Sequence, residues 1–382
     1  MYKFHWLESK QLDRVTNFST EIEPLKYAVK NNIKAYYYCT YANEPRYFGL
    51  KSRIIYLSSF KNKFLKAIEF RIRIVLRTLS IAVAEKNSVI MVNQDLVSLV
   101  LPAFFVNKLF KRNNKFMVDI RTTPTQPETF DRDMVIFHKK FNLAVKFFHG
   151  FSFITPFMEK YVMEGYKKEH YNSVNWSSGV NIDVFNPNIH KRKNHTKTFK
   201  IFYHGGISVS RGNLNLIKAV EILRTEGLDI ELLQVGIIVD QEIIDYVESN
   251  ALKDWCQLLP PVSIEQIPQL IADSDLPVLP FPNFMPWRVS SPIKLMEYLA
   301  MGKKVLAPNM EAFTDVFKSN KELLYYFNTN ANDQVLELKN SIQAIYSDDN
   351  FVSFNEECSN FVAKNYTWYK QAQRLFNFAQ QL

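Results

Sequence analysis

Segments typical of strands alternate with segments typical of helices along most of the chain. In the first half, strands are predicted at residues 33–40, 88–92, 115–120 and 150–155, and helices at about 20–31, 60–85, 96–111 and 133–148. In the second half, strands are predicted at 199–205, 230–236, 256–259, 276–281 and 303–307, and helices at 213–226, 240–251, 263–272 and 292–301. This alternation is typical of parallel α/β sheets covered by helices.

The length of the chain indicates two such sheets. A single core stops growing at about 250–300 residues, and this chain has 382. The polar, basic stretch over 186–199 is the best candidate for a linker. We therefore predict two doubly wound, Rossmann-like domains, over 1–185 and 200–365, that face each other across a cleft. Ligands of such sheets bind beyond the carboxyl ends of the strands, so the cleft is the predicted site.

Composition excludes several classes of protein. An apolar content of 47% with 22% charged residues excludes intrinsic disorder. Only two of the ten glycines lie in the first 150 residues, which excludes an amino-terminal GxGxxG loop, and the chain has no GxxxxGK[ST] loop. The scattered Cys39, Cys256 and Cys358 indicate neither a disulfide scaffold nor a zinc site. Without an apolar leader or a long apolar run, the protein is predicted to be cytoplasmic and at most peripheral at the inner membrane face.

Positive charge is concentrated in one predicted helix. The net charge is +9, and residues 51–80 hold eight basic side chains against the single acid Glu69: Lys51, Arg53, Lys61, Lys63, Lys66, Arg71, Arg73 and Arg77. At helical spacing Lys66, Arg73 and Arg77 share one line. The opposite, core-facing side is predicted to consist of Leu65, Ile68, Ile72, Val75, Leu76 and Leu79. Two interpretations remain, a solvated basic face or an anionic membrane surface that binds residues 60–80.

A second basic cluster lies further along the same half of the chain. It consists of Lys108, Lys111, Arg112 and Lys115. Neither cluster is accompanied by a nucleic-acid recognition motif or by a pattern of stacking aromatic residues, so we predict no nucleic-acid partner.

The helix predicted over 292–301 has the features of an anion site. Ser291 is the predicted N-cap, Pro292 the first helical residue and Gly302 the residue that ends the helix. The start follows a strand, so its N–H groups and positive dipole end point to the ligand side of the sheet. Glu297 lies about 8 Å further along the axis, a distance that suits a carboxylate binding sugar hydroxyls beside a diphosphate. The alternative is an ordinary capped helix with an exposed glutamate.

The loop after the strand predicted at 199–205 is the second candidate for anion binding. Gly205 and Gly206 allow a ligand to approach the backbone closely, and Arg211 offers a planar cation for phosphate just before Gly212. The alternative is a simple βα turn with a surface arginine.

These segments resemble the glycosyl transferases group 1 family, the retaining family-four glycosyltransferases of GT-B fold. The resemblance rests on SSPIKLMEYLAMGKKVLAPN at 290–309, YHGGISVSRGNLNLIKAVEIL at 203–223, SSGVNIDVFNPN at 177–188 and NYTWYKQAQRLFNF at 365–378. It covers most of 177–378 and is weak before residue 150. It implies a GT-B fold in which the first domain binds the acceptor, the second binds a nucleotide sugar, and a closing helix over 366–382 packs back on the first.

The resemblance assigns roles in the donor site by position. Glu297 is the second glutamate of the family's E-x7-E motif and holds the ribose, while Ser290, Ser291 and Lys294 join Gly205 and Gly206 around the diphosphate. Arg211 stands where the family has a phosphate-binding lysine. Two positions depart from the family: Val289 replaces the first glutamate, and Gly206 replaces an arginine.

The first half offers one candidate pair at the end of a predicted strand. Asp119 and Arg121 lie at the carboxyl end of the strand predicted at 115–120. Asp119 is predicted to orient an acceptor hydroxyl or to contact the donor sugar, and Arg121 to bind acceptor phosphate, with a structural Asp–Arg pair as the alternative. The D-x-D strings at 131–133 and 273–275 are typical of metal-dependent transferases, but such strings are common by chance and we predict no metal site and no cofactor. His138 and His149 have no motif around them.

The predicted activity is transfer of a sugar from a nucleotide-sugar donor to an acceptor hydroxyl, with retention implied by the family. Asp119, Arg211 and Glu297 are the predicted catalytic residues. The expected acceptor is a carbohydrate or a lipid-linked one, as in synthesis of cell-surface polysaccharide or glycolipid. Because Val289 and Gly206 depart from the motifs, a degenerate subunit that stabilises an active partner is the alternative. A nucleotide-sugar epimerase needs an acid/base pair that the sequence does not nominate.

Overall fold

The computed structural model describes residues 2–10, 18–40, 50, 53–58, 60, 62–166, 170–193 and 197–382. The chain divides into two compact units. Unit 1 consists of Met1–Ser177 and Trp368–Leu382, and unit 2 of Ser178–Thr367. Lys51 and Lys61 of the predicted basic segment and the side chain of Lys63 lie outside the described residues.

Unit 1 contains a seven-stranded parallel sheet in the order β3-β2-β1-β4-β5-β6-β7. The strands are β1 (Lys3–Leu7), β2 (Lys34–Cys39), β3 (Ile54–Tyr56), β4 (Val89–Asn93), β5 (Lys115–Ile120), β6 (Gly150–Phe153) and β7 (Asn172–Asn175). The order reverses between β1 and β4, as it does in doubly wound sheets. Strand β1 was not among the predicted strands, yet it lies inside the sheet between β2 and β4.

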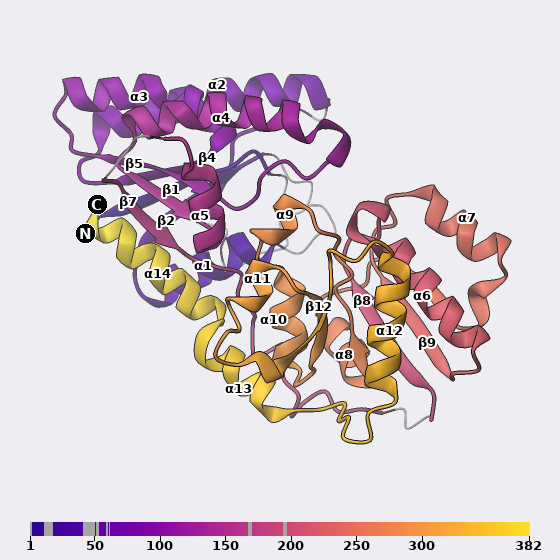
Figure 1. Ribbon diagram of the computed structural model, residues 1–382. Helices are drawn as coiled ribbons and strands as arrows, with labels where there is room; N and C mark the ends of the chain where they lie inside the picture. The colour runs from indigo at the N-terminus through magenta and orange to yellow at the C-terminus, as the bar shows by residue number, and fades with distance from the viewer. Residues whose placement is uncertain are drawn as a thin grey trace. The chain divides into compact units, whose positions relative to one another are not determined.

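The helices of unit 1 are α1 (Ser19–Lys30), α2 (Lys63–Ala84), α3 (Val97–Leu109), α4 (Phe130–Phe147), α5 (Pro156–Met163) and α14 (Trp368–Gln381). Short 3-10 turns lie at η2 (Gln94–Leu96) and η3 (Pro127–Thr129). In Figure 1, α2, α3 and α4 form one layer over the sheet, and α3 packs against both of its neighbours. Helix α14 packs on α1, where Phe376 contacts Phe4 and Tyr27 at ring distances of 5.1 and 5.9 Å.

Unit 2 repeats the same strand pattern. Its strands are β8 (Phe199–His204), β9 (Ile230–Val235), β10 (Cys256–Leu259), β11 (Leu276–Pro277), β12 (Val305–Pro308) and β13 (Leu324–Phe327). Four of them pair in the order β10-β9-β8-β11, β12 pairs with β13, and a parallel bridge between Val278 and Leu306 joins the two sets. The prediction of two doubly wound parallel sheets is confirmed.

Alternate residues of the strands in unit 2 enter two different cores. Ile201 and Tyr203 of β8 pack in one core with α6 (Asn213–Thr225) and α12 (Gln334–Tyr346), whereas Phe202 packs in the other with α10 (Ile293–Ala300) and α13 (Glu356–Asn365). Successive side chains of a strand point to opposite faces, so a parallel strand buried on both sides is apolar throughout. The remaining helical elements of unit 2 are α7 (Gln241–Ser249), α8 (Ile267–Asp273), α9 (Met285–Arg288), α11 (Glu311–Thr314), η4 (Val209–Arg211), η5 (Leu252–Asp254) and η6 (Lys321–Leu323).

The chain enters unit 2 earlier than the predicted boundary at 185. Val180 donates its N–H to the carbonyl of Tyr366 at 2.9 Å and forms a parallel bridge with Thr367, so residues 178–185 pack in unit 2. The described part of the predicted linker, 186–199, packs there as well. Arg192 pairs with Asp275, and the N–H of Lys193 donates to Asp273 at 2.7 Å. These contacts with carboxylates hold this part of the segment on unit 2.

Helix α2 is rotated relative to the predicted orientation. Its buried face carries Phe70, Ile74 and Ile81, whereas the predicted core-facing residues Leu65, Ile68, Ile72 and Leu76 are exposed and Val75 and Leu79 are partly buried. The helix is apolar over most of its circumference, so periodicity alone does not identify the face that packs. Among the described residues no helix has the length and apolar character needed to cross a bilayer.

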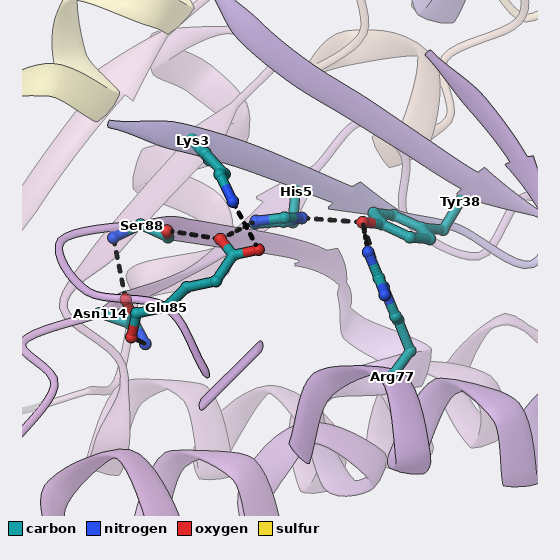
Figure 2. Close-up of polar contacts among 7 residues, drawn as sticks. All are labelled: Lys3, His5, Tyr38, Arg77, Glu85, Ser88 and Asn114. Atoms are coloured by element: carbon teal, nitrogen blue, oxygen red, sulfur yellow. Dashed lines mark hydrogen bonds and ion pairs between the residues drawn. The ribbon is translucent and has the colours of Figure 1, made fainter. Parts of the chain in front are cut away.

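One of the predicted basic residues of α2 points inward. Figure 2 shows Arg77 donating to the hydroxyl of Tyr38, at 3.1 Å from Nη2, and His5 binding the same hydroxyl at 2.9 Å from Nδ1. Nε2 of His5 lies 2.9 Å from Glu85, which also pairs with Lys3 at 3.0 Å. Burial lowers the pKa of His5. This network fixes the carboxyl-terminal part of α2 to β1 and β2.

Candidate active site

The candidate site in unit 2 begins where β8 ends. His204 is the last residue of the strand, and Gly205 follows with φ of +118°, a conformation that side chains other than glycine rarely adopt. Its N–H donates to the carbonyl of Val235 at 2.9 Å. A Cβ at Gly205 would lie 2.5 Å from Nζ of Lys294. The glycine therefore allows the loop backbone to lie directly against this lysine.

Helix α10 starts one residue later than predicted. Pro292 has an extended ψ of 122° and is the N-cap, and the first helical residue is Ile293. Ser291 is not the N-cap; it lies before the cap, and its carbonyl accepts a hydrogen bond from the hydroxyl of Ser178. Gly302, with φ of +72°, follows the last turn as predicted.

Glu297 lies in the middle of α10 and is only 4% exposed. Its Oε2 is 2.7 Å from Nε2 of His204. The other ring nitrogen of His204, Nδ1, lies 3.0 Å from the hydroxyl of Tyr298, and this hydroxyl accepts the backbone N–H of His204 at the same distance. The alternative of an ordinary solvent-exposed glutamate is therefore wrong.

The hydrogen bonds assign a role to each ring nitrogen of His204. Burial holds the pKa of Tyr298 well above its usual range, so the phenol keeps its proton. Because its oxygen already accepts from the backbone, the phenol donates to Nδ1, and Nε2–H donates to Glu297. His204 thus orients one oxygen of the carboxylate.

Lys294 is the second charged group of α10. Its Nζ donates to the hydroxyl of Tyr203 at 2.9 Å and lies 4.2 Å from the centre of that ring. The Tyr203 hydroxyl donates in turn to the carbonyl of Gly206 at 2.8 Å. Burial holds the pKa of Lys294 well below its usual value, and the nearby Arg211 lowers it further while Glu297 raises it.

Arg211 lies beside the same glycine loop. Its guanidinium is 5.2 Å from the centre of the Trp287 ring, whose Nε1 donates to the carbonyl of Ser210 at 3.3 Å. A Cβ at Gly206 would lie 3.6 Å from Cζ of Arg211. The structure therefore brings together the predicted loop, Arg211, Lys294 and Glu297 in one region of unit 2.

The residues just before α10 are held by local hydrogen bonds. The hydroxyl of Ser290 donates to the carbonyl of Trp287 at 3.0 Å, and Ser291 is nearly buried. Val289, at the position of the missing glutamate, is 4% exposed and ends α9. No carboxylate stands at this position.

Three aromatic or imidazole residues of the site were missed by sequence reasoning: Tyr203, His204 and Tyr298. Tyr203 and His204 end an apolar strand directly before two glycines, which is the position of ligand-side residues in a parallel sheet. Tyr298 follows Glu297 directly. The sequence therefore indicated that Tyr203 and His204 lie on the ligand side of the sheet. It did not indicate that His204 pairs with residues more than ninety positions away.

In unit 1 the predicted pair lies at the carboxyl end of β5. Asp119 is 1% exposed, and its Oδ1 accepts from the hydroxyl of Ser152 and from Nε1 of Trp176, the latter at 3.0 Å. Its Oδ2 is buried without a hydrogen-bond partner among the described residues. Burial raises the pKa of Asp119, and Arg121 opposes this effect. Arg121 donates to the carbonyl of Trp176 and lies 3.9 Å from the centre of its ring.

The two D-x-D strings have structural partners. Asp133 accepts from Thr129 at 2.6 Å and from Arg132 at 3.1 Å in the first turn of α4. Asp273 accepts from the N–H of Lys193, and Asp275 accepts from the side chain of Arg192 and from the N–H of Lys200 at 2.9 Å. Within the described ranges, no group of three or more His, Cys, Asp or Glu residues is placed to hold a metal ion.

The fold is that of GT-B glycosyltransferases. Over nearly its whole length the chain is similar to three solved structures. A glycosyltransferase from Rickettsia africae has 16% identity and a TM-score of 0.71, with 99% of this chain and 98% of that one covered. HepE from Anabaena, solved with UDP and glucose, has 13% identity and a TM-score of 0.72, with both chains fully covered. Sucrose-phosphate synthase from Thermosynechococcus elongatus has 13% identity and a TM-score of 0.71, with 100% and 99% covered.

The predicted family is confirmed by sequence in unit 2. Residues 198–348 match the model of glycosyl transferases group 1, and this match covers the glycine loop, Arg211 and Glu297. The predicted enzyme class, a glycosyltransferase, is confirmed with it. No curated protein sequence matches the chain.

Proposed function

We propose that this enzyme transfers a sugar from a UDP-sugar to an acceptor hydroxyl with retention of configuration. The observation that carries the proposal is the buried Glu297 on α10, gathered with Lys294 and Arg211 around the backbone of Gly205 and Gly206. Carboxylate, cations and exposed loop backbone are the groups that bind ribose hydroxyls and a diphosphate. Uridine is favoured because the similar HepE was solved with UDP and glucose.

Glu297 holds the ribose in this proposal. Its carboxylate, which His204 holds in place through Oε2, accepts a hydrogen bond from a ribose hydroxyl. His204 acts through Glu297 and is therefore a positioning residue. A charge-assisted hydrogen bond contributes about 1.5–3 kcal/mol, so loss of the carboxylate weakens UDP binding by about 10- to 100-fold.

The diphosphate is stabilised by groups beside the glycine loop. Arg211 and the N-terminal N–H groups of α10 bind the oxygens on which charge develops when the glycosidic bond breaks. Ser290 and Ser291 precede this helix start. Burial lowers the pKa of Lys294, and the charge of a bound diphosphate raises it and favours the ammonium form. These groups supply the stabilisation that a metal ion provides in other transferases, and we propose that no metal is required.

The acceptor binds to unit 1 in this proposal. Asp119 has one buried carboxylate oxygen without a partner among the described residues, at the ligand end of β5. We propose that this oxygen accepts a hydrogen bond from an acceptor hydroxyl and that Arg121 binds acceptor phosphate. A lipid-linked or carbohydrate acceptor, in the synthesis of cell-surface polysaccharide or glycolipid at the inner membrane face, fits this assignment.

Calorimetric titration of UDP and GDP into Glu297→Ala and Arg211→Ala tests the donor site. Both variants should bind UDP at least about tenfold more weakly than the wild type. Glu231→Ala and Arg224→Ala, whose side chains form exposed ion pairs elsewhere in unit 2, are the matched controls and should bind normally. Undiminished affinity in both site variants rejects the assignment.

Turnover that is unchanged by EDTA supports the metal-free mechanism, and loss of turnover in EDTA contradicts it.

A degenerate, non-enzymatic subunit is the second candidate function. It is favoured by the buried Val289 and by Gly206, where two charged groups of the family are absent. Hydrolysis and transfer assays with a panel of nucleotide sugars separate the two candidates. Turnover that disappears in Arg211→Ala rejects the degenerate subunit, and absence of turnover with every donor that binds rejects the enzyme.

A further inference from the structure

The outer face of α2 is an apolar ridge that no described residue covers. It consists of residues spaced three, four, four and seven apart, which places them on one side of the helix. Each is 41–60% exposed: Leu65, Ile68, Ile72, Leu76 and Val83. Single exposed apolar residues are common on soluble proteins, but five in register on one helix are not.

The ridge is fixed in its outward orientation by the inner face of the same helix. Phe70, Ile74 and Ile81 are buried against unit 1, and Arg77 is held by Tyr38 in the network of Figure 2. Glu85, at the C-cap of α2, binds His5 and Lys3 of β1. Rotation of the helix to bury the ridge would break both sets of contacts. The ridge is therefore a constant surface of unit 1.

The neighbouring helix extends the apolar surface. Helix α3 packs beside α2 in the same layer (Figure 1). At its carboxyl end Phe105, Leu109 and Phe110 are exposed, and Leu109 is among the most exposed large apolar residues described. The two helices run parallel, because each leads from one parallel strand to the next. Exposed apolar side chains therefore lie on both helices of this layer.

Basic side chains flank this surface. Arg71 and Arg73 are exposed on α2, and Lys108 and Lys111 are exposed at the end of α3. The acid of α2, Glu69, pairs with Arg73 at 2.8 Å. An apolar stripe with cationic flanks matches the interface of an anionic bilayer, which offers acyl chains beside negative headgroups.

We propose that the ridge of α2 and the carboxyl end of α3 insert into the interface of an anionic membrane. Helix α2 is about 33 Å long and would lie in the membrane plane, with its apolar side about 5–10 Å deep. This inference names the surface by which the proposed function reaches a lipid-linked acceptor, and it rests on that function for its purpose. This proposal differs from membrane binding by a basic face alone. Here the apolar residues enter the membrane interface, and the cations make binding specific for anionic lipid.

A second copy of the chain is the less suitable occupant. In a symmetric contact each surface meets its own equivalent, so Arg71 and Lys108 would face the same cations of the other copy. Like charges brought together in this way oppose association. An anionic bilayer meets the same cations with opposite charge.

Vesicle co-sedimentation tests the proposal. The vesicles contain phosphatidylcholine alone or two parts phosphatidylcholine to one part phosphatidylglycerol. The wild type should partition to the anionic vesicles, and Ile72→Gln/Leu76→Gln should bind them at least about tenfold more weakly. Leu336→Gln/Val352→Gln, which alters two exposed apolar residues of unit 2, is the matched control and should bind as the wild type does. Arg71→Gln should weaken binding by about fivefold on anionic vesicles only.

Three results overturn the proposal. These are no binding of the wild type to anionic vesicles, equal binding by the ridge variant, and a wild-type dimer that the ridge variant converts to monomer in sedimentation analysis. The assay contains no donor or acceptor, and UDP affinity is measured on the same preparations. Lost vesicle binding with normal UDP affinity in the ridge variant supports the membrane surface, whereas loss of both indicates misfolding and is resolved by repeating the test with Ile68→Ser alone.

Discussion

Replacing Gly205 with alanine should damage the donor site and unit 2 together. Gly205 has φ of +118°, outside the regions open to other residues, and its new Cβ would lie 2.5 Å from Nζ and 3.0 Å from Cε of Lys294. Backbone strain of this kind costs about 1–3 kcal/mol. Displacement of Lys294 from the Tyr203 hydroxyl adds about 1 kcal/mol. The free energy of unfolding should therefore fall by about 3 kcal/mol.

Gly206→Ala is the control that the chain itself provides. Its Cβ would have only ordinary contacts, at 3.6 Å from Arg211, and Gly206 is not among the glycines with positive φ. This variant should change the free energy of unfolding by about 0.5 kcal/mol or less. The two variants add the same methyl group to adjacent residues. The difference between their free energies of unfolding therefore measures the cost of the positive φ at Gly205 and of the collision with Lys294.

Thermal unfolding and UDP titration are the assays. A loss of about 3 kcal/mol lowers the midpoint of a unit of this size by about 6–12 °C. The double variant Gly205→Ala/Lys294→Ala should recover the part of the loss that comes from the collision, since the amine is then gone. If Gly205→Ala unfolds at the same temperature as Gly206→Ala, or if Lys294→Ala recovers nothing, the reasoning about this loop is wrong.

Two further predictions concern stability. Burial lowers the pKa of Lys303 from 10.5 to about 8, so between these pH values the unfolded chain binds more protons and the free energy of unfolding rises with pH. Urea titrations from about pH 8 to 10.5 should show a flatter dependence in Lys303→Met, and an unchanged slope would contradict the shift. In unit 1, Trp176→Phe removes the indole donor of Asp119 and should lower the free energy of unfolding by about 1–2 kcal/mol. Urea denaturation measures it, and a variant as stable as the wild type would show that this hydrogen bond contributes little.

Much of the fold was predictable because parallel α/β sheets leave a local signal. Buried strands are apolar on both faces and helices fall between them, which is how the predicted strands of β5 and β8 were located. Strand β1 was missed because it is a five-residue run with Lys3 and His5, and His5 is tolerated inside the sheet only through Tyr38 and Glu85. These partners are 33 and 80 positions away.

Only part of the donor site could be predicted from the sequence. Gly205 and Glu297 were predictable because they lie in short motifs with a local physical reason. His204 was not, since its role is defined by Glu297 and Tyr298 on another element. The start of α10 was misplaced by one residue because serine followed by proline is typical of an N-cap and a first helical residue, whereas Pro292 has an extended ψ and the carbonyl of Ser291 accepts from Ser178.

The return of α14 to unit 1 sets the order in which the units are completed during synthesis. Residues 178–367 are contiguous, so all of unit 2 leaves the ribosome before α14 does. Until then the surface of unit 1 around Phe4 and Tyr27 lacks its partner Phe376. The synthesis of unit 1 therefore starts before that of unit 2 and is completed after it. A fragment that stops at residue 177 should therefore expose this aromatic surface, whereas a fragment over 178–367 contains every strand and core residue of its unit.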